Sequence, residues 1–231
     1  MEKIYIKTEY CESLSGQAFA ALAGILLMSH KKSLSGELVF TSPLIVFSTL
    51  TGREPTVSDL QIVSKGFKDL IKIGVLKKYH KGYYVVDYSK IERTNENFTC
   101  LNEKEIRTIL NSDAEVNNLS LLQYFALLKS TFDYETKTGN YSLPYYSTIS
   151  GKNKLTILRY HRVLEQLGIL KVFRFKPVRL PDGTVKKPKN IYCCPEDEKS
   201  ALKYALSKGY SLRLKEDAAE DEGLEPDDSE K

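Results

Sequence analysis

The densest group of side chains able to bind an anion lies between Ser150 and Cys194. Its first half contains polar residues whose spacing places them on one side of a helix, at about 100° per residue: Lys152, Arg159, Arg162 and Gln166. Its second half holds seven cations, with Asp182 the single acid between positions 170 and 189, and six of the seven follow Phe173: Arg174, Lys176, Arg179, Lys186, Lys187 and Lys189. Lysine and arginine neutralise phosphates, and arginine also forms paired hydrogen bonds with guanine. The chemistry that this segment indicates is nucleic-acid contact.

A helix followed by a hairpin would hold these residues in place. The predicted core face of the helix has residues at helical spacing: Ile157, Tyr160, Leu164 and Leu167. Gly168 is a typical helix terminator. Two β-rich runs follow, Ile169 to Phe175 and Asn190 to Cys194, separated by the turn signal Pro181-Asp182-Gly183. The sequence therefore predicts a basic β-hairpin directly after the helix.

A helix that leads into a basic hairpin resembles the recognition helix and wing of a winged helix-turn-helix domain. The segment is similar to modules of bacterial replication initiators, replisome organisers and regulators of plasmids and phages. The resemblance implies that duplex DNA is the partner and that the wing cations contact phosphates. It also implies a set of helix residues placed to reach base edges or the backbone: Lys152, Asn153, Lys154, Thr156, Arg159, Arg162 and Gln166.

The same plan occurs once more, 94 residues earlier. The shift aligns Leu70 with Leu164 and Gly74 with Gly168, as expected for two related modules. It places three lysines on the positions of Arg159, Arg162 and Gln166: Lys65, Lys68 and Lys72. These lysines are further candidates for DNA contact. Asp59 and Asp69 dilute the charge of this helix, so the earlier module is expected to serve either dimerisation or weak phosphate binding.

Two local signals predict the limits of the earlier helix and its hairpin. Ser58 and Gln61 form an S-x-x-Q pattern, which predicts a capping box at the helix start. Lys81-Gly82 is the predicted hairpin turn.

Further helices are predicted around four apolar runs: Ala18–Met28, Ser42–Leu50, Leu119–Phe132 and Pro144–Ile149. Residues 1–12 alternate as a short strand would.

The expected fold class is α+β, mainly helical, with two tandem winged helix-turn-helix modules that carry small β-hairpin wings. The N-terminal module is expected over residues 1–90 and the C-terminal module over residues 118–194. Between them, residues 91–117 are expected to form a linker with a short helix, Glu103 to Leu110, capped by Asn102. A C-terminal helix is expected over residues 195–210 and a disordered acidic tail over residues 211–231.

The charge distribution supports a polyanionic partner. The net charge of +4 includes a strongly acidic end, because residues 216–231 hold nine carboxylates and one lysine. Residues 1–215 therefore hold 33 cations and 21 anions. A basic body with an acidic tail is typical of proteins that bind nucleic acid.

Other classes of function lack their signals. The histidines His30, His80 and His161 are isolated and the four cysteines lack CxxC spacing, so no metal and no cofactor are expected. The sequence contains no phosphate loop and no nucleophile elbow, so an enzyme is not expected. The longest apolar stretch is too short to cross a bilayer, and the first residues lack a signal-type core, which predicts a cytoplasmic chain without membrane contact.

The sequence thus predicts a DNA-binding protein of a bacterial plasmid, phage or other mobile element, acting in replication initiation or in transcription regulation. A second copy of the chain and a replication or transcription protein are further partners compatible with this interpretation. The competing interpretation is a non-catalytic interaction subunit built from tandem winged helices, as in chromosome-organising or polymerase-associated complexes. A continuous basic surface would favour DNA, and an exposed apolar patch would favour a protein partner.

Overall fold

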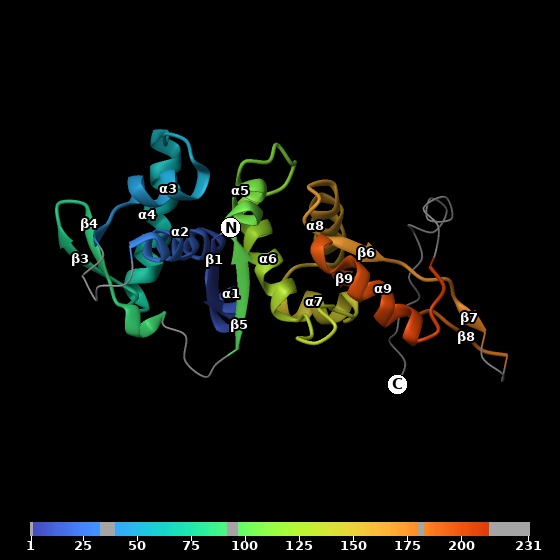
Figure 1. Cartoon of the computed structure of the whole chain (residues 1–231). Helices are drawn as coiled ribbons and strands as arrows, with labels where there is room; N and C mark the ends of the chain where they lie inside the picture. Colours follow the sequence, from blue (N-terminus) through green and yellow to red (C-terminus); the bar gives the residue numbers. More distant parts are fainter. Residues whose placement is uncertain (1, 33–39, 92–96, 180–182, 213–231) are drawn as a thin grey trace. The chain divides into compact units, whose positions relative to one another are not determined.

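A computed structural model describes residues 2–32, 40–91, 97–179 and 183–212 of the chain (Figure 1). The fold is α+β and mainly helical, with 54% of the described residues in helices and with small antiparallel sheets of two and three strands. The chain divides into two compact units. The first unit comprises Met1–Thr131 and Leu143–Leu170, and the second comprises Phe132–Ser142 and Lys171–Lys231.

The first unit begins with a strand and two helices: β1 (Lys3–Lys7), α1 (Thr8–Ser13) and α2 (Gly16–Lys32). The strand predicted over residues 1–12 is confirmed over 3–7 and is wrong from Thr8 onward, where the chain turns into α1. The helix predicted around Ala18–Met28 is confirmed and is longer at both ends. Its apolar residues are almost completely buried, so α2 is the central helix of this unit.

Helix α3 (Pro43–Thr51) follows the short strand β2 (Phe40–Thr41). The Ser42 hydroxyl accepts a hydrogen bond from the Ile45 backbone N–H at 3.4 Å, and Gly52 ends the helix with φ 73°. Proline at the first helical position and glycine beyond the end are the usual asymmetry of helix termini. The helix predicted from Ser42 to Leu50 is confirmed.

Helix α4 (Val57–Lys72) starts earlier than the sequence indicated. Its capping box is formed by Thr56 and Asp59: the Thr56 hydroxyl accepts from the Asp59 N–H at 3.2 Å, and the Asp59 carboxylate accepts from the Thr56 N–H at 2.9 Å. The predicted box of Ser58 and Gln61 is wrong. The Asp59 carboxylate is favoured because it accepts from the Thr56 N–H and also lies 2.9 Å from the Arg53 guanidinium. Its negative charge is further stabilised by the positive end of the helix dipole.

Strands β3 (Leu76–His80) and β4 (Tyr83–Val86) form the predicted hairpin, and β2 pairs with β4 to give the sheet order β2-β4-β3. The turn residues Lys81 and Gly82 have φ angles of 28° and 85°. Positive φ at both central residues is what a type I′ turn, a common two-residue hairpin turn, requires.

Helices α2, α3 and α4 pack closely against one another, and two of the contacts are made at glycines. A Cβ atom added to Gly66 of α4 would lie 2.4 Å from the carbonyl oxygen of Gln17 in α2. One added to Gly24 of α2 would lie 2.8 Å from the Val46 side chain of α3. A side chain larger than glycine at either position would therefore push the helices apart.

Strand β5 (Phe98–Asn102) pairs with β1 in an antiparallel ladder that joins segments far apart in sequence (Figure 1). The register places Lys3 opposite Asn102 and Lys7 opposite Phe98. Helix α5 (Glu103–Leu110) follows at once and is capped by Asn102 with Glu105 at the third position, as predicted. In the sequence, the short helix η1 (Tyr88–Lys90) lies between β4 and β5.

Helix α5 is fixed to both of its neighbours in the first unit. The Arg107 guanidinium donates to the carbonyl oxygen of Thr49, near the end of α3, at 3.1 Å. The Lys129 ammonium of α6 (Asn118–Ser130) donates to the Glu105 carboxylate at 2.7 Å. Much of the segment expected as a linker is therefore a packed part of this unit.

Helices α6, α7 (Leu143–Ser150) and α8 (Lys154–Gln166) complete the first unit and pack against one another. The helix predicted over Leu119–Phe132 is confirmed as α6, which ends at Ser130, before Phe132. Leu122, Phe125 and Leu128 are fully buried, as predicted, whereas Phe132 is only half-buried. The helix predicted from Pro144 to Ile149 is confirmed as α7.

The second unit contains two small strand pairs, a 3-10 turn and a helix: β6 (Lys171–Phe173) with β9 (Ile191–Cys193), β7 (Val178–Arg179) with β8 (Val185–Lys186), η2 (Pro195–Asp197) and α9 (Glu198–Ser207). Gly139 forms an isolated bridge to Tyr192 of β9. The core of this unit is a small cluster that includes Phe175, Ile191 and Ala201.

The two predicted strands of this region are confirmed over shorter ranges, as β6 and β9, and the C-terminal helix is confirmed over Glu198–Ser207. The β7 and β8 pair was not predicted. Gly209 follows α9 with φ 72°, as expected for its end. Of the predicted turn, Gly183 has φ 86°, whereas Pro181 and Asp182 lie outside the described residues. Most of the expected acidic tail also lies outside them, since the described residues end at 212.

All four cysteines are free thiols: Cys11, Cys100, Cys193 and Cys194. Within residues 2–32, 40–91, 97–179 and 183–212, no helix has both the length and the apolar character needed to cross a membrane.

Candidate nucleic-acid interface

Helix α8 begins at an asparagine cap. The Asn153 side-chain oxygen accepts a hydrogen bond from the Thr156 backbone N–H at 2.8 Å, which satisfies one of the free N–H groups of the first turn. Asn153, predicted to reach a base, therefore has its side-chain oxygen engaged at the helix start. Its exposed amide group lies at the end of α8 that carries the positive pole of the helix dipole.

The buried face of α8 is the predicted one. Ile157, Tyr160 and Leu164 are 0%, 5% and 0% exposed, and Leu167 is half-buried at the helix end. His161 is also buried, and its Nε2 shares a hydrogen bond of 2.6 Å with the Tyr124 hydroxyl of α6. Burial raises the pKa of Tyr160 above its ordinary value. These contacts fix the rotation of α8 about its axis.

The opposite face of α8 carries four exposed side chains at positions i, i+4, i+7 and i+11: Leu155, Arg159, Arg162 and Gln166. This set is called the outward row of α8. Lys154 is exposed beside it, and Thr156 is half-buried. The structure thus brings together on one helix face three of the predicted residues and a leucine that was not predicted. The row extends over about three turns of helix, with two guanidinium groups at its centre.

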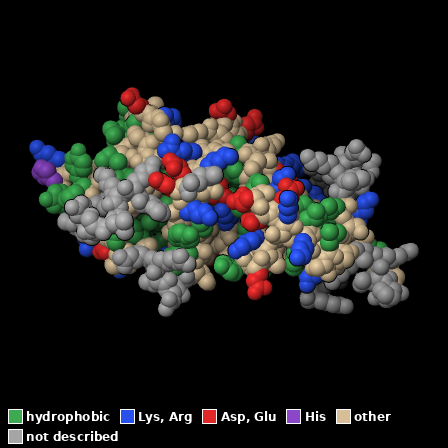
Figure 2. Space-filling model, in the orientation of Figure 1, with side chains coloured by type: hydrophobic (Ala, Val, Ile, Leu, Met, Phe, Trp, Pro, Cys, Tyr) green, Lys and Arg blue, Asp and Glu red, His purple; other side chains and the backbone are tan. Residues whose placement is uncertain are grey.

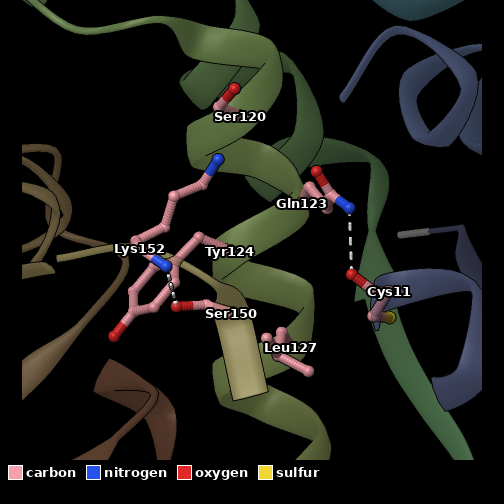
Figure 3. Close-up of a pocket in the computed structure, with 7 residues that line it drawn as sticks. All are labelled: Cys11, Ser120, Gln123, Tyr124, Leu127, Ser150 and Lys152. Carbon is pink, nitrogen blue, oxygen red and sulfur yellow. Dashed lines mark hydrogen bonds between the residues drawn. The ribbon is translucent and has the colours of Figure 1, made fainter. Parts of the chain in front are cut away.

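Lys152 lies apart from this row. It is half-buried, and its side chain runs beside α6 with the ammonium pointing towards Ser120 (Figure 3). It lines a shallow cleft of about 10 Å³, together with side chains of α6 and Cys11. A cleft of that volume has room for about one water molecule, so it is no ligand pocket for a larger group.

Arg159 has an acidic neighbour that the sequence did not reveal. Its guanidinium donates to the Glu115 carboxylate at 3.3 Å, and the two side chains are 58% and 92% exposed. Glu115 precedes α6 and lies 44 positions from Arg159 in the chain. No periodicity in the sequence links two residues so far apart, so only the packing of α6 and α8 could identify the pair.

The outward face of α4 carries the three predicted lysines. Lys65, Lys68 and Lys72 are exposed, in line with Gln61 at the start of the same row. The Lys72 ammonium lies 3.3 Å from the Asp69 carboxylate. Hydrogen bonds from Ser15 and from Lys72 hold the pKa of Asp69 below its ordinary value, so this carboxylate stays charged and offsets part of the lysine charge.

Helices α4 and α8 end in the same way. The Val75 N–H donates to the Leu70 carbonyl at 3.0 Å, and the Ile169 N–H donates to the Leu164 carbonyl at 3.1 Å. The glycine that precedes each donor has φ 79° in α4 and 68° in α8. Both are left-handed helix terminators with the same bonding pattern. The backbone similarity at these two helix ends falls at the 94-residue shift seen in the sequence.

The cations of the predicted wing lie in the second unit. Four of them are exposed: Arg174, Lys176, Lys187 and Lys189. The backbones of Arg179 and Lys186 belong to the β7 and β8 pair. Lys176 is held by its backbone N–H, which donates to the Ser211 carbonyl at 2.9 Å. The basic residues thus form two groups, one on the helices of the first unit and one on the strands of the second.

Comparison of the chain with protein-family models and with curated protein sequences gave no match. Function is therefore inferred from the outward row of α8, from the basic strands and from the order of the elements.

Proposed function

We propose that this protein binds double-stranded DNA and that α8 is its leading recognition helix. The observation that carries the proposal is the outward row of α8, in which Arg159 and Arg162 are exposed on the side opposite a fully buried face. Arginine grips phosphate and reads guanine edges with the same planar group. The setting that we propose is replication initiation or transcription regulation on a bacterial plasmid, phage or other mobile element.

We further propose that the chain contains two tandem winged helix-turn-helix modules. In the first, the order of elements supports this: α2, β2, α3, α4 and the β3-β4 hairpin follow one another, with β2 beside β4. A strand between the first two helices that pairs with the hairpin gives the hairpin a fixed attachment to the helices. That attachment is what a wing needs in order to meet DNA beside its recognition helix.

In the second module, the same order recurs from α6 to β9. The segment between α6 and α7 meets β9 at one bridge, where Gly139 and Tyr192 exchange hydrogen bonds of 2.9 and 2.8 Å. Gly139 therefore stands beside β9 as β2 stands beside β4. The β7-β8 pair lies between β6 and β9 in sequence, and we propose that it forms the outer part of the wing.

The two proposed recognition helices differ in the chemistry of their outward faces. On α8 the cations are arginines, whereas on α4 they are Lys65, Lys68 and Lys72. Lysine acts on phosphate as a point charge, and arginine adds a bidentate geometry that suits base edges. The first module is therefore proposed to give sequence-independent contacts or to serve dimerisation, and the second to read the site.

Fluorescence anisotropy with labelled duplexes tests the proposal. Sites selected by the full-length protein from a random library should bind more tightly than random duplex of the same length. The logarithm of the affinity should fall linearly with the logarithm of salt concentration, with a slope of about 0.9 for each phosphate contact. Absence of binding at low salt would overturn the proposed function.

The alternative is an interaction subunit without DNA contact, and one observation favours it. Hydrophobic side chains gather at the end of the first unit that carries β3 and β4 (Figure 2). Among them, Phe40, Tyr79 and Tyr83 are 39%, 66% and 49% exposed, and the Phe40 and Tyr79 rings are 4.9 Å apart. Replacing Tyr79 and Tyr83 by serine should leave DNA affinity unchanged if α8 leads binding. Because the alternative involves no DNA contact, absence of duplex binding by the unchanged chain at low salt would favour it.

A further inference from the structure

Leu155 stands out on a face where every neighbour in the row is polar. Its side chain is 78% exposed, in the first turn of α8. It is followed in the outward row by Arg159, Arg162 and Gln166. The core side of the same turn is already filled by Ile157, which is fully buried. Leu155 therefore contributes little to the packing of the first unit.

The position of Leu155 is the one from which a recognition helix reads bases. In helix-turn-helix proteins the N-terminal residues of the recognition helix contact base edges in the major groove. Leu155 is the second residue of α8, after the Asn153 cap and Lys154. A leucine offers neither donor nor acceptor, so the feature of the major groove that it can contact is apolar. The C5-methyl group of thymine is the apolar group displayed there.

We infer that Leu155 is a specificity-determining residue that packs on a thymine C5-methyl group in the major groove. This inference rests on the proposed function and adds to it a base preference. Lys154 and Arg159 flank the leucine along the helix and supply the phosphate or guanine contacts that hold it in register. The site that α8 reads accordingly contains a thymine next to the bases or phosphates met by these cations.

The first module lacks this arrangement. The residue of α4 that corresponds to Leu155 is Gln61, which is exposed and polar. Val57 is the exposed apolar residue of the first turn of α4, at 75% exposure. It is similar to Leu155 in exposure and in placement near a helix start, but it lies on the other module. Val57 therefore provides a matched control for the removal of an exposed apolar side chain.

The test removes the C5-methyl group of a thymine and leaves the other groups of the major groove unchanged. The full chain is first used to select a duplex site. Each thymine of that site is then replaced in turn by deoxyuridine, which keeps the hydrogen-bonding groups and lacks the C5-methyl. At one position the affinity should fall about fourfold, which corresponds to about 0.8 kcal/mol for one buried methyl group.

The same substitutions are then measured with Leu155→Ala. This variant should bind the thymine site about fourfold more weakly than the unchanged chain, and it should no longer distinguish thymine from deoxyuridine at that position. Val57→Ala should keep the full distinction. Circular dichroism and thermal unfolding should be unchanged in both variants, because both side chains are exposed.

The possible outcomes distinguish a failure of the proposed DNA binding from a failure of the proposed contact between Leu155 and thymine. If no duplex binds at low salt, the proposed function fails and this inference fails with it. If duplex binds but no single thymine shows a methyl effect that depends on Leu155, the inference alone is overturned. The same holds if Val57→Ala removes the effect equally. A Leu155→Ala variant with unchanged DNA affinity would also overturn it.

Discussion

The Arg159 guanidinium lies 3.3 Å from the Glu115 carboxylate, so the segment before α6 places an anion against the outward row of α8. Both side chains are more than half exposed. Exposed ion pairs contribute only about 0–1 kcal/mol, because water screens them. A phosphate can therefore displace Glu115 at small cost, and Glu115 in turn competes with phosphate for the arginine.

The first prediction concerns this competition. Glu115→Gln should raise the affinity for random duplex about two- to fivefold at low salt, an effect within the range of an exposed ion pair. The gain should shrink as salt rises. Asp113→Asn removes the same charge from a residue two positions away and should give a smaller gain. Equal gains from the two variants in anisotropy titrations would mean that only net charge matters.

The second prediction compares the two proposed recognition helices. Changing Arg159 and Arg162 together to alanine should weaken binding to a selected site by about 1–3 kcal/mol for each base that the arginines read. Changing Lys65 and Lys68 together should cost less and should reduce the salt slope. All four side chains are exposed, so the unfolding midpoints should stay close to that of the unchanged chain. A greater weakening by the lysine pair would assign the leading role to α4.

A third prediction concerns the buried pair between α5 and α6. The Lys129 ammonium and the Glu105 carboxylate are 2.7 Å apart, and their side chains are 14% and 7% exposed. Lys129→Met would leave the Glu105 carboxylate buried without this counter-charge, which typically costs about 3–5 kcal/mol. The midpoint of urea unfolding should fall accordingly. Lys104→Met changes an exposed lysine of α5 and should have little effect; similar decreases from both would contradict the assignment.

A fourth prediction follows from the capping box of α4. Hydrogen bonds from Arg53 above all, and then from Thr56, hold the pKa of Asp59 below its ordinary value of 3.8. A carboxyl whose pKa is lower in the folded state stabilises the fold above the unfolded value, and this contribution is lost as pH falls through the folded pKa. Asp59→Asn should therefore cost about 1 kcal/mol at pH 7, typical of a lost cap.

The difference between Asp59→Asn and the unchanged chain should begin to shrink near pH 3.8 and continue to shrink below it. Denaturant titrations at a series of pH values would measure this. Glu54→Gln, an exposed neighbour, provides the control. A difference that stays constant down to acid pH would show that the carboxylate charge has no part in the cap.

Much of the helical part of the fold could be predicted because its signals are local. The apolar spacing of α8 and the glycine after it predicted both its buried face and its end, and the same holds for α4. The capping box of α4 was assigned to the wrong residues because Thr56 to Asp59 and Ser58 to Gln61 are both good capping patterns. Only the tertiary position of Arg53, whose guanidinium meets Asp59, favours the first.

The parts of the candidate site that could not be predicted depend on contacts between distant segments. Glu115 approaches Arg159 only because α6 and α8 pack together. Leu155 was missed for a different reason: a leucine in an amphipathic helix is normally read as core, and only its exposure shows that it lies on the other side. Asn153 fits both a cap and a base contact by residue type, and the hydrogen bond to Thr156 identifies the cap.

The ladder between β1 and β5 has a consequence for how the chain acquires its structure during synthesis. Lys3–Lys7 cannot pair until Phe98–Asn102 has left the ribosome, although α2, α3 and α4 between them can already collapse on one another. Contacts of such long sequence separation form slowly, and an unpaired strand edge is a site of aggregation meanwhile. A translation pause while Phe98–Asn102 is still inside the ribosome should therefore lower the soluble yield of the nascent chain, whereas a pause after this segment has emerged should not.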